Sequence, residues 1–147
     1  MSYKGKYQPK NPQKYRGDVN NIIYRSLWER KFLIYCDTNE NVIEYASEEL
    51  ALPYRSPIDN KIHRYFPDFY IKVKESNGSI KKYIIEIKPK KQTVEPIPQK
   101  RKTRGYIYEV YEYAKNQAKW KAAEEWCADR RYEFKVLTED DLGLGTK

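Results

Sequence analysis

Histidine and cysteine are scarce in this sequence, and long apolar runs are missing from it. His63 is the only histidine, and the two cysteines, Cys36 and Cys127, lie far apart with no Cys-x-x-Cys pair. This supply of ligands excludes a Cys/His zinc site and a reaction centred on histidine. No apolar run approaches the length of a membrane span, and no signal peptide is visible. The sequence therefore predicts a soluble protein of a reducing compartment with no membrane partner.

Acidic residues are outnumbered by basic ones. The chain has 29 Lys and Arg against 21 Asp and Glu, a formal net charge of +8. Such an excess favours polyanionic partners, chiefly nucleic acid, because each neutralised phosphate releases counterions; a generally soluble basic surface is the alternative. The 147 residues suit a single domain with one modest core. The 15 tyrosines against 4 phenylalanines indicate core filling for most of them, with base stacking and protein interfaces as other uses.

Two runs that look like buried strands carry acidic residues. They are residues 64–70 (RYFPDFY) and 84–88 (IIEIK), both rich in aromatic or β-branched side chains. Because successive side chains of a strand alternate faces, Glu86 and Lys88 share one face, and Asp68 joins them if the strands are neighbours. Carboxylates gathered at a sheet edge suit Mg²⁺. The alternative is a pair of strand-end carboxylates satisfied by neighbouring lysines.

Two further segments are strongly basic. Residues 1–18 are predicted to form an extended basic arm, because glycine and two prolines oppose a helix there. The arm is either a solvated tail or a strap along a phosphate backbone, and its tyrosines favour packing or contact. Residues 89–104 are predicted to form an exposed basic loop, either a DNA clamp or a solvated loop. The basic residues of this loop are Lys90, Lys91, Lys100, Arg101, Lys102 and Arg104.

The remaining elements follow from apolar periodicity and turn residues. A helix is predicted to begin within residues 24–32, with Ser26 and Glu29 as a capping box, and to end in the polar segment 37–41. Its predicted apolar stripe consists of Leu27, Trp28, Phe32, Ile34 and Tyr35. Strands are predicted over residues 42–52, limited by Pro53, and over residues 62–73, 80–88 and 133–137. Turns are predicted at 56–60 and 76–78, and the start of a short terminal turn at 138–141.

Residues 106–130 have helical spacing, as one helix or as two helices that meet near Asn116. The predicted buried stripe of this segment is Ile107, Val110 or Tyr111, Ala114, Ala118, Ala122 and Trp126.

The Pro-Asp…Glu-x-Lys pattern of residues 67–68 and 86–88 resembles the PD-(D/E)xK superfamily of metal-dependent nucleases. The predicted order α-β-β-β-α-β matches the core of that restriction-endonuclease-like fold, an α/β (α+β) class in which helices flank a mixed sheet. Blocks at 24–30, 63–69, 86–89, 116–123 and 133–142 resemble the TnsA-like endonuclease domain more specifically. With the arm and the basic loop, the whole chain resembles the head completion nucleases of T-even-type tailed bacteriophages.

That resemblance implies a single nuclease domain over residues 1–147 and an enzyme, a Mg²⁺-dependent endodeoxyribonuclease in which Mn²⁺ can substitute. It implies action on DNA ends during phage head completion after genome packaging, with duplex DNA or its ends as the partner and portal or neck proteins as further ones. The implied location is the cytoplasm of the infected bacterial host, or the phage head itself. The alternative function is a non-catalytic DNA-end or portal-binding protein on the same fold.

The resemblance also assigns roles to residues. Asp68 and Glu86 would hold the metal ion, with the backbone carbonyl of Ile87 as an extra ligand, and Lys88 would orient the attacking water. Glu29 matches a first-helix glutamate directed at the metal, but a purely capping role explains it equally well.

Nucleic acid would contact the basic loop and the second helix, through Gln117 and Lys119 there, although a solvated helix position also explains Gln117. His63 is predicted to be a hydrogen-bonding residue at a strand edge.

Overall fold

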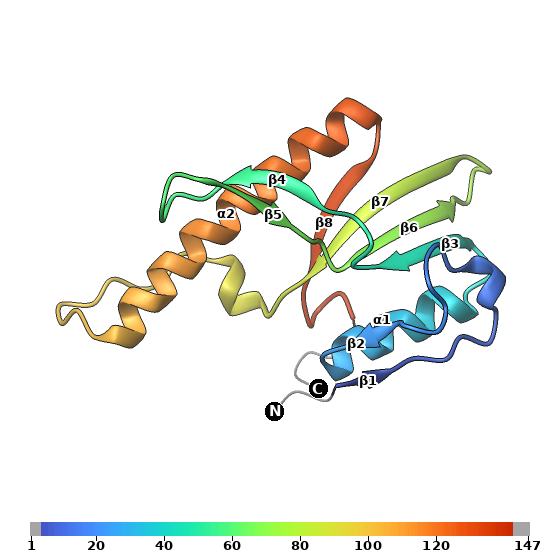
Figure 1. The fold of residues 1–147 in the computed structure, drawn as a ribbon, viewed down its shortest axis with the longest axis horizontal. Helices are drawn as coiled ribbons and strands as arrows, with labels where there is room; N and C mark the ends of the chain where they lie inside the picture. Colours follow the sequence, from blue (N-terminus) through green and yellow to red (C-terminus); the bar gives the residue numbers. More distant parts are fainter. Residues whose placement is uncertain (1–3, 143–147) are drawn as a thin grey trace.

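A four-stranded mixed sheet forms the centre of the protein, seen here in a computed structural model that describes residues 4–142 (Figure 1). Its order is β3-β6-β7-β8, in which β3, β6 and β7 are antiparallel neighbours and β8 runs parallel to β7. The bounds are β3 Val42–Ser47, β6 Phe69–Lys74, β7 Ile80–Ile87 and β8 Glu133–Leu137. The hairpin turn predicted at 76–78 joins β6 to β7, and Gly78 there has a φ of 87°, which glycine adopts without strain.

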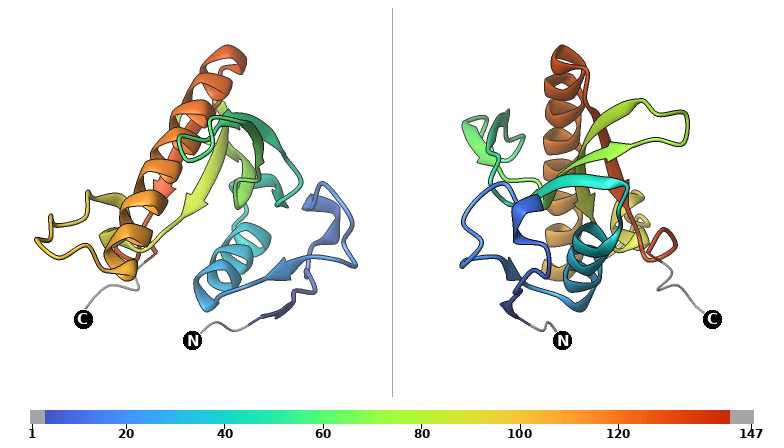
Figure 2. Two further views of the ribbon diagram at one scale, coloured as in Figure 1. Left: turned by 60° about the vertical axis from the view of Figure 1, so that its left-hand side comes forward. Right: turned by 90° about the vertical axis from the view of Figure 1, so that its right-hand side faces the viewer.

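Two helices cover opposite faces of this sheet (Figure 2). Helix α1, Leu27–Thr38, precedes β3, and helix α2, Arg104–Arg130, connects β7 to β8. A parallel pair of strands requires a crossover of this kind, because a tight turn can join only antiparallel strands. The order α1-β3-β6-β7-α2-β8 confirms the predicted α-β-β-β-α-β core with helices flanking a mixed sheet. In the described part of the chain, neither helix combines the length and apolar character that crossing a bilayer requires.

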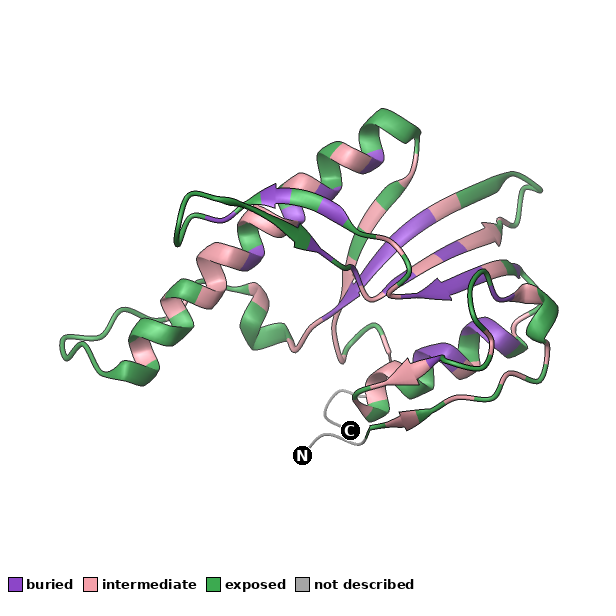
Figure 3. Cartoon of the chain, in the orientation of Figure 1, coloured by how far each residue is buried: buried purple, intermediate pink, exposed green. Residues whose placement is uncertain are grey.

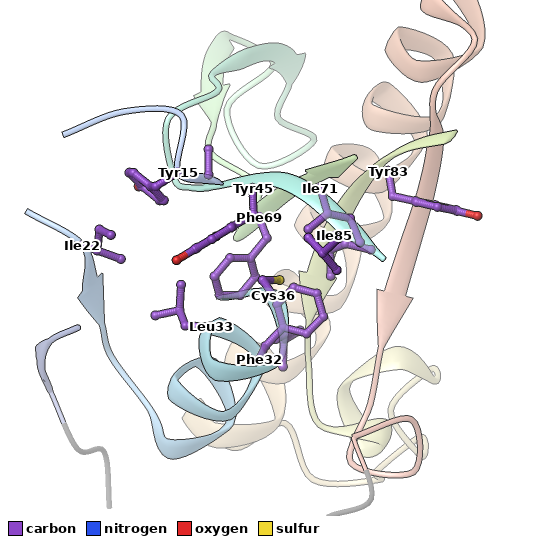
Figure 4. Close-up of a cluster of buried hydrophobic side chains, with 13 residues drawn as sticks. Tyr15, Ile22, Phe32, Leu33, Cys36, Tyr45, Phe69, Ile71, Tyr83 and Ile85 are labelled. Atoms are coloured by element: carbon purple, nitrogen blue, oxygen red, sulfur yellow. The ribbon is translucent and has the colours of Figure 1, made fainter. Parts of the chain in front are cut away.

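The core between α1 and the sheet is rich in aromatic rings (Figure 4). Phe32 packs against Phe69 with ring centroids 4.7 Å apart, and Leu33 and Cys36 are fully buried beside them. The stripe predicted for α1 was therefore partly wrong, since Leu27 and Tyr35 remain 51% and 45% exposed. Phe32, Leu33 and Cys36 form the buried side, and Figure 4 shows them directed toward the sheet. Figure 3 colours the buried positions of the chain purple, α1 included.

Helix α2 runs through Asn116 without a break, so the alternative of two helices is wrong. Its buried residues are Asn116, Trp120, Ala123 and Cys127. Of the predicted stripe, Ala118, Ala122 and Trp126 are partly buried and pack against the same core cluster, so the prediction was partly right. The first half of the predicted stripe was wrong, since Ile107 and Tyr111 are 39% and 52% exposed. The first half of α2 extends beyond the sheet (Figure 1), so its apolar residues do not mark the buried side.

Two predicted strands are interrupted. The chain leaves β3 at Glu48, where φ is 53°, and the run predicted over 62–73 is broken before Phe69. Between these breaks lies a separate hairpin of β4, Leu52–Arg55, and β5, Ile62–Tyr65, in which Pro53 stands inside β4 and does not end a strand. The turn predicted at 56–60 connects the two strands, with the Ser56 N–H donating to the Lys61 carbonyl at 2.9 Å. His63 lies on β5 and shares a hydrogen bond with Asp59 Oδ2 at 2.8 Å, as predicted.

The basic arm packs against α1 and β3 over its described part. It contains β1, Gly5–Lys6, paired with β2, Ile23–Tyr24, and a short 3-10 helix η1, Pro12–Lys14. Asp37, fully buried, accepts hydrogen bonds from the Tyr7 hydroxyl at 2.6 Å and the Asn11 N–H at 2.9 Å. Burial alone would raise the pKa of Asp37, but the hydrogen bonds from the arm outweigh it and lower the pKa. The expected packing of the arm tyrosines is thus confirmed for Tyr7 and Tyr15; Tyr3 lies outside the described residues.

Lys14 attaches the arm to the end of α1. Its Nζ donates to the carbonyl oxygens of Cys36 at 2.6 Å and Asn39 at 2.9 Å, which satisfies groups that a helix end leaves unpaired. At the other end of the chain, the turn predicted after β8 is present, with the Thr138 N–H donating to Asp141 Oδ2 at 2.8 Å.

Candidate active site

Asp68 and Glu86 lie opposite each other where β6 begins and β7 ends. Phe69 pairs with Ile85 in the antiparallel ladder, which places the preceding Asp68 across from Glu86. The Ile87 N–H donates to Asp68 Oδ2 at 2.8 Å and fixes that carboxylate. The predicted adjacency of the two acids is confirmed. Asp68, however, stands in the link between β5 and β6 and not inside a strand.

Lys88 follows β7 directly and shares the face of Glu86, as strand alternation predicts. Its Nζ lies 3.8 Å from Glu86 Oε2, and its side chain is 29% exposed. The backbone N–H of Lys88 donates to the Leu137 carbonyl at 2.9 Å, so the parallel neighbour β8 holds this residue in place. The site thus presents the buried carboxylate of Glu86, the half-buried carboxylate of Asp68 and an ammonium group that remains accessible to solvent.

Glu29 lies in the first turn of α1, close enough for its charge to affect Asp68. The Glu29 N–H donates to Ser26 Oγ at 3.1 Å, which confirms Ser26 as the helix cap. Its carboxylate accepts from the Arg25 N–H at 3.1 Å, whereas a capping box would use the Ser26 N–H. The negative charge of Glu29 helps to raise the pKa of Asp68. Burial raises the pKa of Glu29 itself, and the positive charge of Lys88 opposes that shift. Glu29 therefore combines a contact at the helix start with an electrostatic influence on Asp68.

Burial and mutual repulsion dominate the electrostatics of the site. Burial raises the pKa of Asp68, and the negative charge of Glu86 raises it further. Burial also raises the pKa of Glu86, against the Tyr65 hydrogen bond and the positive charges of Lys88 and Lys119. Buried carboxylates with raised pKa values are typical of functional sites, and a cation placed between them would stabilise their charged forms.

The donor atoms fit a small, hard cation. All are oxygens, and Mg²⁺ is commonly held by one or two carboxylates while water and phosphate oxygens fill its other positions. Within residues 4–142, no three His, Cys, Asp or Glu side chains gather closely enough to enclose an ion by themselves. The protein thus supplies the pair Asp68 and Glu86. Ile87 lies beside that pair because its own N–H is bonded to Asp68.

The β4–β5 hairpin adds Tyr65, a contact that the sequence analysis missed. The Tyr65 hydroxyl donates to Glu86 Oε1 at 2.6 Å, and the side chain is only 4% exposed. Tyr65 precedes Asp68 by three positions, which was a signal of proximity. Its partner could not be inferred, because the separate hairpin was taken for parts of two longer strands.

Lys119 of α2 also reaches the site. Its Nζ lies 5.6 Å from the ring centroid of Tyr65 and 5.8 Å from that of Tyr54. Burial lowers the pKa of Lys119, while the charge of Glu86 opposes that shift. Gln117 is exposed. Positions two apart lie on nearly opposite sides of a helix, so the structure does not bring Gln117 to the carboxylates.

The predicted basic loop divides into two parts. Next to the site is a short 3-10 helix η2, Lys90–Thr93, where Lys90 Nζ lies 3.1 Å from Asp140 Oδ2 and the Lys90 N–H donates to Glu139 at 2.7 Å. The far part reaches the start of α2, away from the sheet (Figure 1). Lys102 Nζ lies 5.1 Å from the Tyr106 ring centroid. The exposed cations of the loop are Lys90, Lys91, Lys100, Arg101, Lys102 and Arg104.

Comparison with known proteins agrees with this geometry. The family model "TnsA-like endonuclease N terminal" matches residues 39–139, which include β3, Asp68, Glu86 and α2. The head completion nuclease of Enterobacteria phage T4 is 41% identical to the chain over 152 residues, covering 100% of this chain and 99% of that protein. No solved structure matches the chain. The two matches show that this chain belongs to the TnsA-like endonuclease family.

Proposed function

We propose that this endonuclease is a Mg²⁺-dependent endodeoxyribonuclease that acts on DNA ends during phage head completion, with Mn²⁺ as a substitute ion. The observation that carries the proposal is the pair of Asp68 and Glu86, which meet where β6 begins and its antiparallel neighbour β7 ends, with Lys88 on the same face as Glu86. The similarity to the T4 head completion nuclease over the full chain supports the biological setting. Its partners would be DNA and, in the phage, portal or neck proteins.

We further propose that residues 1–147 form one nuclease domain. The described arm packs into the same core as α1 and β3, which supports this assignment. The host cytoplasm, or the phage head itself, is the proposed location.

Phosphodiester hydrolysis requires an oriented water molecule and compensation of the charge that develops on the phosphoryl oxygens. Asp68 and Glu86, with the Ile87 carbonyl and Glu29 as further candidates, would hold the ion, which supplies Lewis acidity when bound. Lys88 is suited to positioning water and to stabilising negative charge.

The direct test is cleavage of linear duplex DNA with Mg²⁺, with Mn²⁺ and with EDTA. We expect cleavage with either ion and none with EDTA. Protein that binds DNA ends tightly but cuts no substrate with either ion would support the alternative of a non-catalytic end-binding protein.

Neutralising the far part of the basic loop should weaken DNA binding. With Lys100, Arg101, Lys102 and Arg104 replaced by Gln, fewer counterions are released, and the slope of log Kd against log salt should fall by about 0.9 for each phosphate that the variant no longer neutralises. Single-turnover cleavage at saturating protein should change much less, because these residues lie away from the carboxylates. The measurement is DNA binding at several salt concentrations.

A charge-matched control replaces the exposed Lys31, Lys61, Lys74 and Lys81 of α1, the β4–β5 turn, β6 and β7. It removes the same total charge from elsewhere on the protein. Equal slopes for the two variants would show that the loop has no special contact with DNA.

A further inference from the structure

We infer that Tyr65 is a positioning residue of the active site. Its hydrogen bond holds one oxygen of Glu86 and leaves the other available for the metal ion. The inference rests on the proposed metal-dependent function and names a residue of that site that lies outside the Pro-Asp…Glu-x-Lys pattern. Tyr65 comes from the β4–β5 hairpin, which is not one of the elements of the α-β-β-β-α-β core.

The first step of the argument is the direction of the hydrogen bond. A carboxylate can only accept, so the hydroxyl of Tyr65 donates its proton to Glu86 Oε1, over 2.6 Å. Hydrogen bonds to an ionised acceptor are short and about twice as strong as neutral ones. Glu86 Oε1 is thereby occupied, and Oε2 is the oxygen that faces the Lys88 ammonium at 3.8 Å.

Asp68 also has one of its two carboxylate oxygens held by a hydrogen bond, in this case from the backbone of β7. The Ile87 N–H donates to its Oδ2 at 2.8 Å, and no hydrogen bond within residues 4–142 uses Oδ1. Asp68 therefore keeps Oδ1 for a ligand, and Glu86 keeps Oε2, which the Lys88 ammonium approaches only to 3.8 Å, beyond hydrogen-bond distance. This arrangement favours Mg²⁺, which keeps several waters and has strict geometry, over Ca²⁺, which accepts more ligands and bidentate carboxylates.

Tyr65 itself is held firmly. Its ring is buried together with Leu52, Tyr54, Trp120 and Ala123 between the hairpin and α2, and Lys119 lies over the ring face. A side chain packed on several sides loses little further freedom when it orients its partner. The hairpin thus acts on the metal site through a single hydroxyl group.

The test compares Tyr65→Phe with Tyr54→Phe. Both substitutions remove one hydroxyl from the buried inner side of the same hairpin, beneath the same lysine, but only Tyr65 bonds to Glu86. Calorimetric titration with Mg²⁺ and with Ca²⁺, without DNA, measures metal binding independently of turnover. Circular dichroism and thermal melting in EDTA establish that each variant is folded.

Tyr65→Phe should bind Mg²⁺ about 10- to 100-fold more weakly, the usual cost of losing an outer partner of a metal ligand, and its preference for Mg²⁺ over Ca²⁺ should fall. Tyr54→Phe should bind both ions like the wild type. If Tyr65→Phe binds Mg²⁺ within twofold of the wild type, or if the two variants weaken it equally, the inference is wrong while the proposed function stands. Wild-type protein that binds no divalent ion at all, alone or with DNA, would overturn both.

Discussion

Asp68→Asn should lower the rate of DNA cleavage by more than about 100-fold, beyond the 10- to 100-fold typical of losing only an outer partner of a metal ligand. Asn keeps an oxygen that can accept the hydrogen bond from the Ile87 N–H, so the ladder between β6 and β7 is preserved. It removes the negative charge that the metal ion requires. The measurement is single-turnover cleavage at saturating Mg²⁺, with Asp129→Asn, an exposed change on α2, as the control.

The same substitution should make the metal-free protein more stable at neutral and higher pH. Burial and the charge of Glu86 raise the pKa of Asp68 in the folded state, so the folded protein binds a proton that the unfolded chain has already released. The free energy of unfolding therefore falls as pH rises above the ordinary pKa of an aspartate, and Asn removes this loss. Melting temperatures in EDTA across pH test this expectation. Cleavage by Asp68→Asn at the wild-type rate would remove Asp68 from the catalytic site.

Glu29→Gln should reduce cleavage about 10- to 100-fold while the melting temperature stays close to that of the wild type. A Gln side chain still offers an oxygen to the Arg25 N–H, which Glu29 now contacts at 3.1 Å, but it cannot supply a negative charge. Partial recovery at high Mg²⁺ would accompany a role beside the metal. The measurement is cleavage as a function of Mg²⁺ concentration together with thermal melting.

Glu29→Ala is the comparison that separates the two roles. It removes the charge and the contact at the helix start together, and it should cost at most about 0.5–2 kcal/mol, the range for losing a helix cap. Normal cleavage by a well-folded Glu29→Gln protein would show that Glu29 only stabilises α1. The active site would then consist of Asp68, Glu86 and Lys88.

The sequence predicted the elements that depend on local patterns. Apolar periodicity located both helices and the strand run that became β7, and the Ser-Asn-Gly turn located the hairpin between β6 and β7. Strand alternation placed Glu86 and Lys88 on one face, and the hairpin brought Asp68 to the same place. These features were predictable because each is set by residues close together in the chain.

Features that depend on distant contacts could not be predicted in this way. Which residues of α2 are buried depends on where the sheet ends. The predicted stripe therefore included residues such as Ile107 that remain exposed. The break at Glu48 and the separate β4–β5 hairpin arise because Leu52, Tyr54 and Tyr65 pack on α2. Buried Asp37 was expected in a polar turn, since nothing local indicates that the arm would supply its hydrogen-bond donors.

If the basic loop contacts DNA as proposed, the projecting half of α2 sets a length scale for the substrate. From Arg104, where the basic loop ends, to Lys119 beside the carboxylates, an α-helix rises about 22 Å at 1.5 Å per residue. That distance corresponds to about six or seven base pairs of duplex at 3.4 Å each. A duplex shorter than this on the loop side of the cut cannot contact the basic loop while its cut site lies at Lys119 and the carboxylates. Cleavage at low protein concentration should therefore depend on how much duplex lies next to the cut, with a threshold set by the length of a single helix.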